Sequence, residues 1–114
     1  MKVYSTAIPY FIVNDAASAI ELYKVAFDAT EFVRLADPSG KVMHAEIRIG
    51  NSPLMLADEF PDMGYRSPPS LGGSPVSVLL YVEDVDTLFN QAVAAGAKET
   101  MAVADQFEGI AAAH

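Results

Sequence analysis

Three side chains that could take part in chemistry occupy alternate positions of one short stretch, namely His44, Glu46 and Arg48. The residues that alternate with them are all apolar: Met43, Ala45, Ile47 and Ile49. Successive side chains of a β-strand point to opposite faces, so the polar groups should share one face and the apolar groups the other. An imidazole and a carboxylate two residues apart can act as a general base and the group that orients it. Glu46 and His44 are therefore candidate catalytic residues.

A second interpretation of the same stretch is a solvated strand face, whose cross-strand ion pair contributes little to stability. The tyrosines of two other strand-like stretches, Tyr10 and Tyr81, are more often core aromatics with a bonded hydroxyl than catalytic acids. The sequence has no glycine-rich phosphate loop and no serine in a nucleophile-elbow context. It also has no cysteine, which excludes disulfides, thiolate metal sites and cysteine nucleophiles.

Strand and helix patterns alternate through the first half of the chain. Residues 5–13 are β-branched and aromatic and predict a strand, in which Pro9 favours an edge or an early position. Asn14-Asp15 offers a cap for a helix over residues 16–26. Three further strands are predicted, separated by turns at residues 37–40 and 50–53: residues 30–35, 42–49 and 54–56.

The second half begins with residues 58–75, which are dense in Pro, Gly and Ser. This segment is too long for a tight turn and should be a crossing connection or a lid. An almost continuous apolar run predicts a strand over residues 76–82. Asp84 should cap a second helix that continues to about Ala95, Gly96 should end it, and residues 98–103 predict another strand.

The two halves repeat one pattern. The stretch from Tyr10 to Asp15 is echoed by Leu79 to Asp84, since each is a strand that ends in a polar residue and an Asp cap before an amphipathic helix. After the helices, the stretch from Phe27 to Glu31 is echoed by Ala95 to Glu99. Strand, cap, helix and next strand recur in order, which favours two copies of one supersecondary unit over chance similarity.

From Thr6 to about Gly109 the chain resembles the vicinal-oxygen-chelate superfamily of glyoxalases, bleomycin-resistance proteins and extradiol dioxygenases, and within it the PhnB-like subgroup. The stretches that carry the resemblance in the first half are Ile12-Val13-Asn14-Asp15, Ala19-Ile20-Glu21-Leu22-Tyr23 with Phe27, Met43 to Gly50, and Leu54 to Asp58. Those in the second half are Tyr81 to Asp86, Ala94-Ala95-Gly96-Ala97, and Asp105-Gln106-Phe107. Each is weak alone, whereas their order and spacing are specific.

The resemblance implies an α+β fold of two βαβββ modules, whose curled mixed sheets form a cleft. We expect one domain over residues 1–114, with module 1 at about 4–58, a connection at about 59–74 and module 2 at about 75–114. Strand alternation then predicts which side chains line a ligand-binding cleft: Ile8, Tyr10, His44, Glu46, Arg48, Ser77, Leu79 and Tyr81. We expect Ile8, Glu46 and Ser77 to converge there, with Met43, Ala45 and Ile47 packed beneath the first helix.

Metalloenzymes of this superfamily hold a divalent ion with four side chains, typically His or Glu. Carried over by position, the first falls on Ile8, which cannot coordinate, the second on Glu46, which can, and the third on Ser77, a poor ligand. The fourth would lie on a closing strand that this sequence does not visibly contain. One good ligand of four makes no ordinary metal site. We therefore expect no conventional cofactor, although a divalent metal on Glu46 stays open.

The second module is incomplete in this sequence. Where relatives continue with a loop, a turn and a closing strand, Asp105 to Gly109 runs directly into Ile110 to His114, which resembles the end of that strand. A module without these strands would leave a long apolar edge unpaired, which natural sheets avoid. We expect a missing loop near Glu108 to Ile110, which a break in the ordinary 3.8 Å spacing of Cα atoms would reveal.

The formal net charge of −8, with only 7 Lys and Arg among 114 residues, argues against a nucleic-acid partner. No apolar run approaches the roughly 20 residues that span a bilayer, and the start lacks a signal-peptide pattern, so we expect a cytoplasmic protein without a membrane partner. The exposed edges of two curled sheets favour a homodimer.

Three functions stay open. The first is a protein that binds a small molecule in the cleft without a conventional metal centre, with His44, Glu46 and Arg48 fixing a polar or charged group. The second is a metal-dependent lyase or dioxygenase of the same superfamily, with Glu46 as a ligand. The third is a structural or interaction dimer without ligand chemistry.

Overall fold

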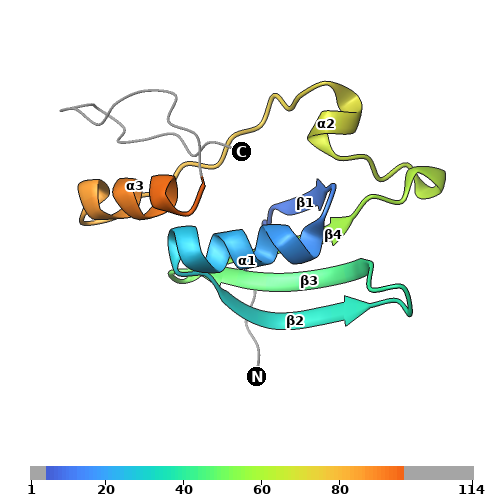
Figure 1. Ribbon diagram of the computed structural model, residues 1–114, viewed down its shortest axis with the longest axis horizontal. Helices are drawn as coiled ribbons and strands as arrows, with labels where there is room; N and C mark the ends of the chain where they lie inside the picture. The colour runs from blue at the N-terminus through green and yellow to red at the C-terminus, as the bar shows by residue number, and fades with distance from the viewer. Residues whose placement is uncertain (1–4, 97–114) are drawn as a thin grey trace.

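The computed structural model describes residues 5–96. Its strands are β1 (Tyr10–Val13), β2 (Thr30–Ala36), β3 (Val42–Ile49) and β4 (Ser52–Asp58). Its helices are α1 (Ala16–Phe27), the 3-10 helix η1 (Pro61–Met63), α2 (Pro68–Leu71) and α3 (Val85–Ala94). The strands form one curled sheet in the order β1-β4-β3-β2, with β1 parallel to β4 and the other pairs antiparallel, and α1 lies on one face (Figure 1). The predicted α+β class with a curled mixed sheet is confirmed.

Helix α1 begins and ends where its sequence requires. The Asp15 carboxylate accepts a hydrogen bond from the Ser18 amide at 3.2 Å, which satisfies one of the free N–H groups of the first turn. At the other end Asp28 adopts the left-handed conformation, with φ of 57°. One face of the helix packs on the sheet, and the buried core joins the two: Ala16, Ile20, Ala29, Val42, Ala45, Ile47, Leu54 and Leu56.

The last residue of β4 connects the sheet to the start of α1. The side chain of Asp58 is almost fully buried, and its carboxylate accepts hydrogen bonds from the amide of Ala16 at 2.8 Å and the amide of Val42 at 2.7 Å. Ala16 is the first residue of α1 and Val42 the first of β3. One buried charge is therefore stabilised by two backbone donors that the sheet and the helix leave free.

Two bulges interrupt the pairing of β2 with β3. Glu31 pairs with Ile47 and Val33 with Glu46, so Phe32 is an extra residue on β2. Leu35 pairs with His44 and Ala36 with Val42, which makes Met43 an extra residue on β3. The prediction that Met43 packs beneath α1 is wrong: its side chain is 54% exposed, and the bulge brings Val42 into the core instead. Ala45 and Ile47 lie in the core as predicted.

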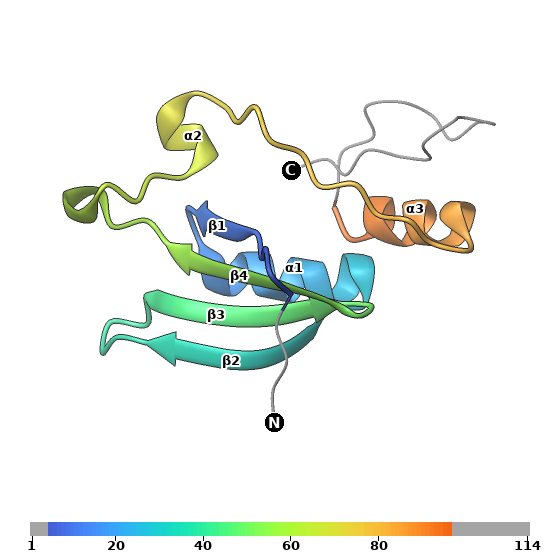
Figure 2. The same ribbon diagram turned by 180° about the vertical axis from the view of Figure 1, so that it is seen from behind.

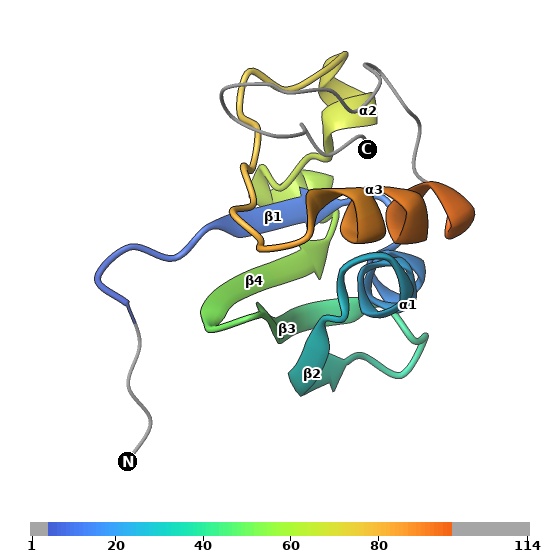
Figure 3. The same ribbon diagram turned by 90° about the vertical axis from the view of Figure 1, so that its left-hand side faces the viewer.

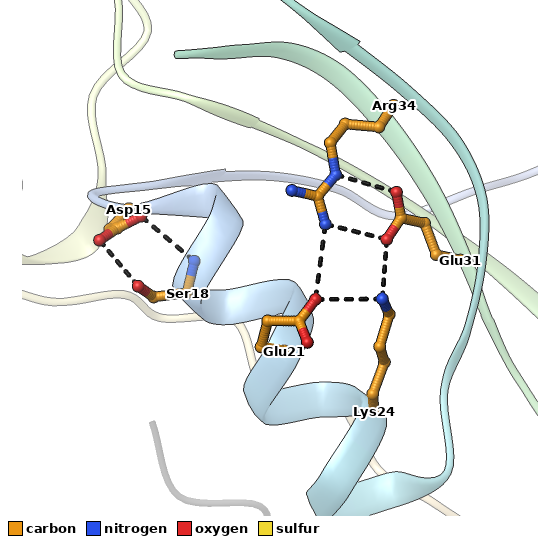
Figure 4. A network of polar contacts seen from close by, with 6 residues as sticks. All are labelled: Asp15, Ser18, Glu21, Lys24, Glu31 and Arg34. Carbon is orange, nitrogen blue, oxygen red and sulfur yellow. Dashed lines mark hydrogen bonds and ion pairs between the residues drawn. The ribbon is translucent and has the colours of Figure 1, made fainter. Parts of the chain in front are cut away.

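The bulge at Phe32 also explains an ion-pair network between α1 and β2 (Figure 4). Residues three apart on a regular strand face opposite sides, but the extra residue lets Glu31 and Arg34 meet in a bidentate pair with both contacts at 2.9 Å. Lys24 of α1 joins them at 2.9 Å from Glu31, and Glu21 lies 3.0 Å from Lys24. Hydrogen bonds from Arg34 and then Lys24 lower the pKa of Glu31 to about 2.

Helix α3 packs beside α1 (Figure 3). Asp84 caps α3 through the Thr87 amide at 3.0 Å, as predicted, and Gly96 follows its end with φ of 115°. The Gln91 side-chain amide donates to the carbonyls of Val25 at 2.9 Å and Ala26 at 3.2 Å. Gln91 thus satisfies free carbonyls in the last turn of α1.

The predicted strand over residues 76–82 is wrong, because this segment forms no strand in the described structure. Most of its side chains are exposed, including Val76 and Tyr81. An apolar run becomes a strand only when a neighbouring strand supplies hydrogen bonds. The predicted strand over residues 98–103 and the expected break near Glu108 to Ile110 lie outside the described residues. Among residues 5–96 no helix is long and apolar enough to cross a membrane.

The connection after β4 is held by a second carboxylate. Glu59 accepts hydrogen bonds from the amide and the hydroxyl of Ser67, each at 2.7 Å, and from the hydroxyl of Ser70. Ser67 is fully buried and precedes α2. These hydrogen bonds lower the pKa of Glu59 to about 2, and the one from Ser70 has the largest effect. The connection is therefore an ordered segment between residues 59 and 71.

We predict that Asp58→Ala lowers the free energy of unfolding by about 2–6 kcal/mol, because two buried amides lose their acceptor at about 1–3 kcal/mol each. Urea denaturation followed by circular dichroism measures the change. Asp62→Ala is the matched control, since Asp62 is exposed in η1 and its loss should cost no more than about 0.5 kcal/mol. Equal effects of the two substitutions would contradict the role of Asp58.

Protonation of Glu59 at low pH should weaken the hydrogen bonds that hold the connection between residues 59 and 71. Its pKa in the folded chain is about 2, below the roughly 4.3 of an unperturbed glutamate, so its stabilisation is complete above about pH 4.3 and is lost as the pH falls through about 2. The chemical shift of the Ser67 amide should titrate with a midpoint near the Glu59 pKa. In Glu59→Gln this titration should vanish. A midpoint above pH 4, or a titration that persists in Glu59→Gln, would refute the assignment.

Candidate functional site

Four of the polar candidates lie on the sheet face opposite α1. Figure 2 shows this face of the sheet. Strand register decides this placement. Tyr10 pairs with Met55, Met55 with Glu46, and Glu46 with Val33, so these four positions form one row across the sheet. Paired positions share a face, and Phe11 and Val13 of β1 instead pack against the core on the α1 side. We call the face that carries Tyr10 and Glu46 the polar face.

A tyrosine and a histidine span one strand of the polar face. The hydroxyl of Tyr10 on β1 lies 3.0 Å from Nδ1 of His44 on β3, and the two ring centroids are 5.6 Å apart. Strand β4 runs between these two strands, and Met55 is its residue that pairs with Tyr10. Burial, with a smaller contribution from Tyr65, raises the pKa of Tyr10.

The Tyr10–His44 pair can transfer or hold a proton. Which of the two atoms donates depends on the imidazole tautomer. A neutral imidazole with its Nδ1 held by a hydroxyl presents its other nitrogen to a bound molecule. This matches the geometry expected of a base and an orienting group, although the orienting partner of His44 is Tyr10 and not Glu46.

A buried carboxylate lies beside an arginine on the same face. Only 1% of Glu46 is exposed, and its Oε2 lies 3.4 Å from a terminal nitrogen of Arg48. The Arg48 guanidinium also lies 5.0 Å from the centre of the Phe32 ring, on the bulge of β2. The Nε of Arg48 is buried and has no hydrogen-bond partner in the described part of the chain. A buried donor of this kind is costly, and an acceptor on a bound molecule would satisfy it.

The remaining predicted site residues lie elsewhere. Ile8 is half-buried and precedes β1. Ser77, Leu79 and Tyr81 are exposed on the segment between α2 and α3. The structure therefore brings together Tyr10, His44, Glu46 and Arg48, while convergence of Ile8 and Ser77 with Glu46 stays a prediction.

Sequence reasoning missed a cavity of about 480 Å³ along the outer edge of β1. Its walls come from β1, from the C-terminal half of α1 and from residues between 66 and 80. Of the eight predicted cleft residues, Tyr10 alone lines it. The segment after α2 contributes Val76, Val78 and Leu80, which alternate with the predicted Ser77, Leu79 and Tyr81. Because residues 76–82 are an almost continuous apolar run, no alternation in the sequence indicates which of their side chains line the cavity.

The described donor set does not fit the divalent metal that the superfamily's metalloenzymes use. Within residues 5–96 no three His, Asp or Glu side chains come together. A guanidinium lies beside Glu46, the one matching ligand position, and would repel a cation there. Nδ1 of His44 is hydrogen-bonded to Tyr10. The side chains of residues 5–96 therefore form no divalent-metal site of the superfamily's ordinary kind.

Comparison with known proteins identifies the family. The model of the glyoxalase/bleomycin resistance protein/dioxygenase superfamily matches residues 6–112. The chain therefore belongs to this superfamily. It is similar to protein Mb0911c of Mycobacterium bovis, at 48% identity over 104 residues that cover 89% of this chain and 68% of the relative. Two relatives from Mycobacterium tuberculosis match equally, and the chain spans 61% of their length.

Solved structures share the fold. The product of the Arabidopsis thaliana gene At5g48480 aligns with a TM-score of 0.69 at 25% identity, over 89% of this chain and 80% of that one. The PhnB protein of Bacillus cereus aligns with a TM-score of 0.68 at 16% identity, covering 94% and 95%. The fosfomycin resistance protein FosX of Listeria monocytogenes, solved with Mn(II), aligns at 0.62 and 12% identity, covering 85% and 73%. The two more distant structures support the fold alone.

We predict energetic coupling between Glu46 and Arg48. Arg48→Gln should lower the free energy of unfolding by roughly 1–3 kcal/mol, less than the 3–5 kcal/mol of fully buried pairs, because Arg48 is partly exposed. In a double-mutant cycle with Glu46→Gln, measured by urea denaturation at pH 7, the coupling should be about 1 kcal/mol. Additive effects of the two substitutions would show that the pair does not interact.

Proposed function

We propose that this chain binds a small organic molecule on the polar face, within a metal-free, PhnB-like branch of its superfamily. The observation that carries the proposal is the buried Nε of Arg48, which has no hydrogen-bond partner among residues 5–96 and lies beside the buried Glu46 carboxylate. A ligand oxygen that reaches Nε, after a small movement of the groups that cover it, would satisfy this donor. Such a contact to a charged donor contributes about 1.5–3 kcal/mol.

The other polar-face groups suit a ligand that carries both donors and acceptors. The bridge of Tyr10 and His44 offers an imidazole nitrogen, and the Phe32 ring beneath Arg48 offers an apolar surface. Recognition by a few polar groups among apolar side chains is typical of small-molecule sites. Proton transfer through His44 would make the protein an enzyme, and binding alone would make it a carrier or a resistance protein. The homodimer expected from the sequence stays a prediction.

A thermal-shift screen of the untagged protein tests this function. The screen covers hydrophobic antibiotics and divalent metal salts, and we expect stabilisation by an organic compound without added metal. Arg48→Gln should weaken binding of that compound about tenfold, as loss of one contact to a charged group predicts. Lys41→Gln is the charge-matched control, because Lys41 lies over Phe60 at the end of the sheet and should leave binding unchanged.

Two results would contradict the proposal. One is a stabilising organic compound whose affinity is the same in Arg48→Gln and the wild type. The other is one equivalent of divalent metal in the purified protein, found by elemental analysis, together with stabilisation by that metal alone. The second result would favour the metal-dependent lyase or dioxygenase.

A further inference from the structure

The cavity along β1 has a different character from the polar face. Its volume of about 480 Å³ lies in the range of small-molecule sites. In the figures the chain passes from α2 towards α3 on the β1 side of the sheet, and residues of this segment form the outer wall (Figure 1). The inner wall includes Phe11 and the two aromatic rings of α1, Tyr23 and Phe27, whose centroids are 6.3 Å apart. This cavity can hold an apolar body of about the size of two fused rings with a substituent.

Among the described residues, one charged side chain lines this apolar cavity, that of Arg66. Every other Lys or Arg within residues 5–96 has a partner. Lys24, Arg34 and Arg48 contact carboxylates, and Lys41 lies 4.6 Å from the centre of the Phe60 ring. Arg66 is exposed and has neither a hydrogen bond nor an ion pair within the described chain. Its guanidinium is free to receive an anion at the cavity wall.

The position of Arg66 is fixed by the connection that holds the outer wall. Its neighbour Ser67 is buried and donates to Glu59 through both its amide and its hydroxyl at 2.7 Å. On the other side, Tyr65 forms a backbone bridge with Phe60, with the Tyr65 amide 3.1 Å from the Phe60 carbonyl. An arginine between two such anchors loses less backbone entropy when it binds a ligand.

We propose that this cavity binds an amphipathic anion, with an aromatic or aliphatic body against Phe11, Tyr23 and Phe27 and an acidic group on Arg66. This site is separate from the function proposed for the polar face, because it uses a different cation and shares only Tyr10 with the residues named for that face. A neutral molecule of the same shape would gain the apolar contacts alone. The acidic group therefore sets the specificity of this site, and the rings supply most of its affinity.

A matched pair of fluorescent probes tests the site. The anion is 1-anilinonaphthalene-8-sulfonate, and its neutral counterpart is N-phenyl-1-naphthylamine, which has the same rings without the sulfonate. We expect saturable binding of the anion at one equivalent per chain. Arg66→Gln should weaken the anion roughly tenfold and leave the neutral probe unchanged. Lys41→Gln removes a charge outside the cavity and should alter neither probe.

A second variant tests the apolar walls. Val78→Glu places a carboxylate in the outer wall and should weaken both probes, the anion more strongly. If Val78→Glu loses its native circular dichroism, Leu71→Glu replaces it, since Leu71 also lines the cavity and is 65% exposed. Equal affinity of the anion for Arg66→Gln and the wild type would overturn the proposal. Unchanged binding of both probes in the wall variant would overturn it as well, whatever the outcome at Arg48.

Discussion

The buried carboxylate of Asp58 at the end of β4 connects this strand to the start of α1, 42 residues away in sequence, and to the start of β3, 16 residues away. It accepts from the first amide of α1 at 2.8 Å and from the first amide of β3 at 2.7 Å, while its own backbone pairs with Val13 at the end of β1. A shift of β4 by one residue would remove this acceptor from two buried donors and turn every side chain of the strand to the opposite face. The hydrogen bonds of Asp58 and the burial of Leu54 and Leu56 therefore favour the same register of β4. Because Tyr10 and Glu46 meet across Met55 of β4, the polar face depends on this register too.

The bulges of β2 and β3 distribute polar side chains between the two faces of the sheet. On the α1 side, the extra residue at Phe32 brings Glu31 and Arg34 together, and helix lysine Lys24 completes the network. On the polar face, the same extra residue places the Phe32 ring near the Arg48 guanidinium. The first cluster is internally satisfied by charge-assisted hydrogen bonds, whereas the second retains a buried donor, Arg48 Nε, without a partner in the described chain. Satisfied networks stabilise a fold, and an unsatisfied donor on the polar face is the feature that a ligand can complete.

Local patterns in the sequence predicted the helices α1 and α3, their N-caps and the four described strands, but not the short helices η1 and α2. Asp15 and Asp84 were recognised as caps, because Asp is strongly favoured as the N-cap of a helix and each precedes a stretch with apolar residues at helical spacing. Alternation placed Ala45 in the core and predicted a shared face for His44 and Glu46. It failed at Met43, since a bulge depends on the partner strand and leaves no periodic trace. It failed over residues 76–82, where strand formation depends on a partner distant in sequence. The cavity and the contact of Gln91 with α1 are likewise products of tertiary packing, which no local window contains.

The acidity of the chain constrains both proposed ligands. A formal net charge of −8 repels anions at long range, and screening limits that repulsion to about 8 Å at physiological ionic strength. An anion must therefore gain its affinity from short-range contacts. At Arg66 those contacts are the apolar walls plus one cation, which suits a ligand with a large apolar body and a single charge. At Arg48 the neighbouring Glu46 already neutralises the guanidinium, so a polar or weakly charged oxygen is the better partner there. The two sites thus differ in the charge they accept, because one arginine has a carboxylate beside it and the other has none in the described structure.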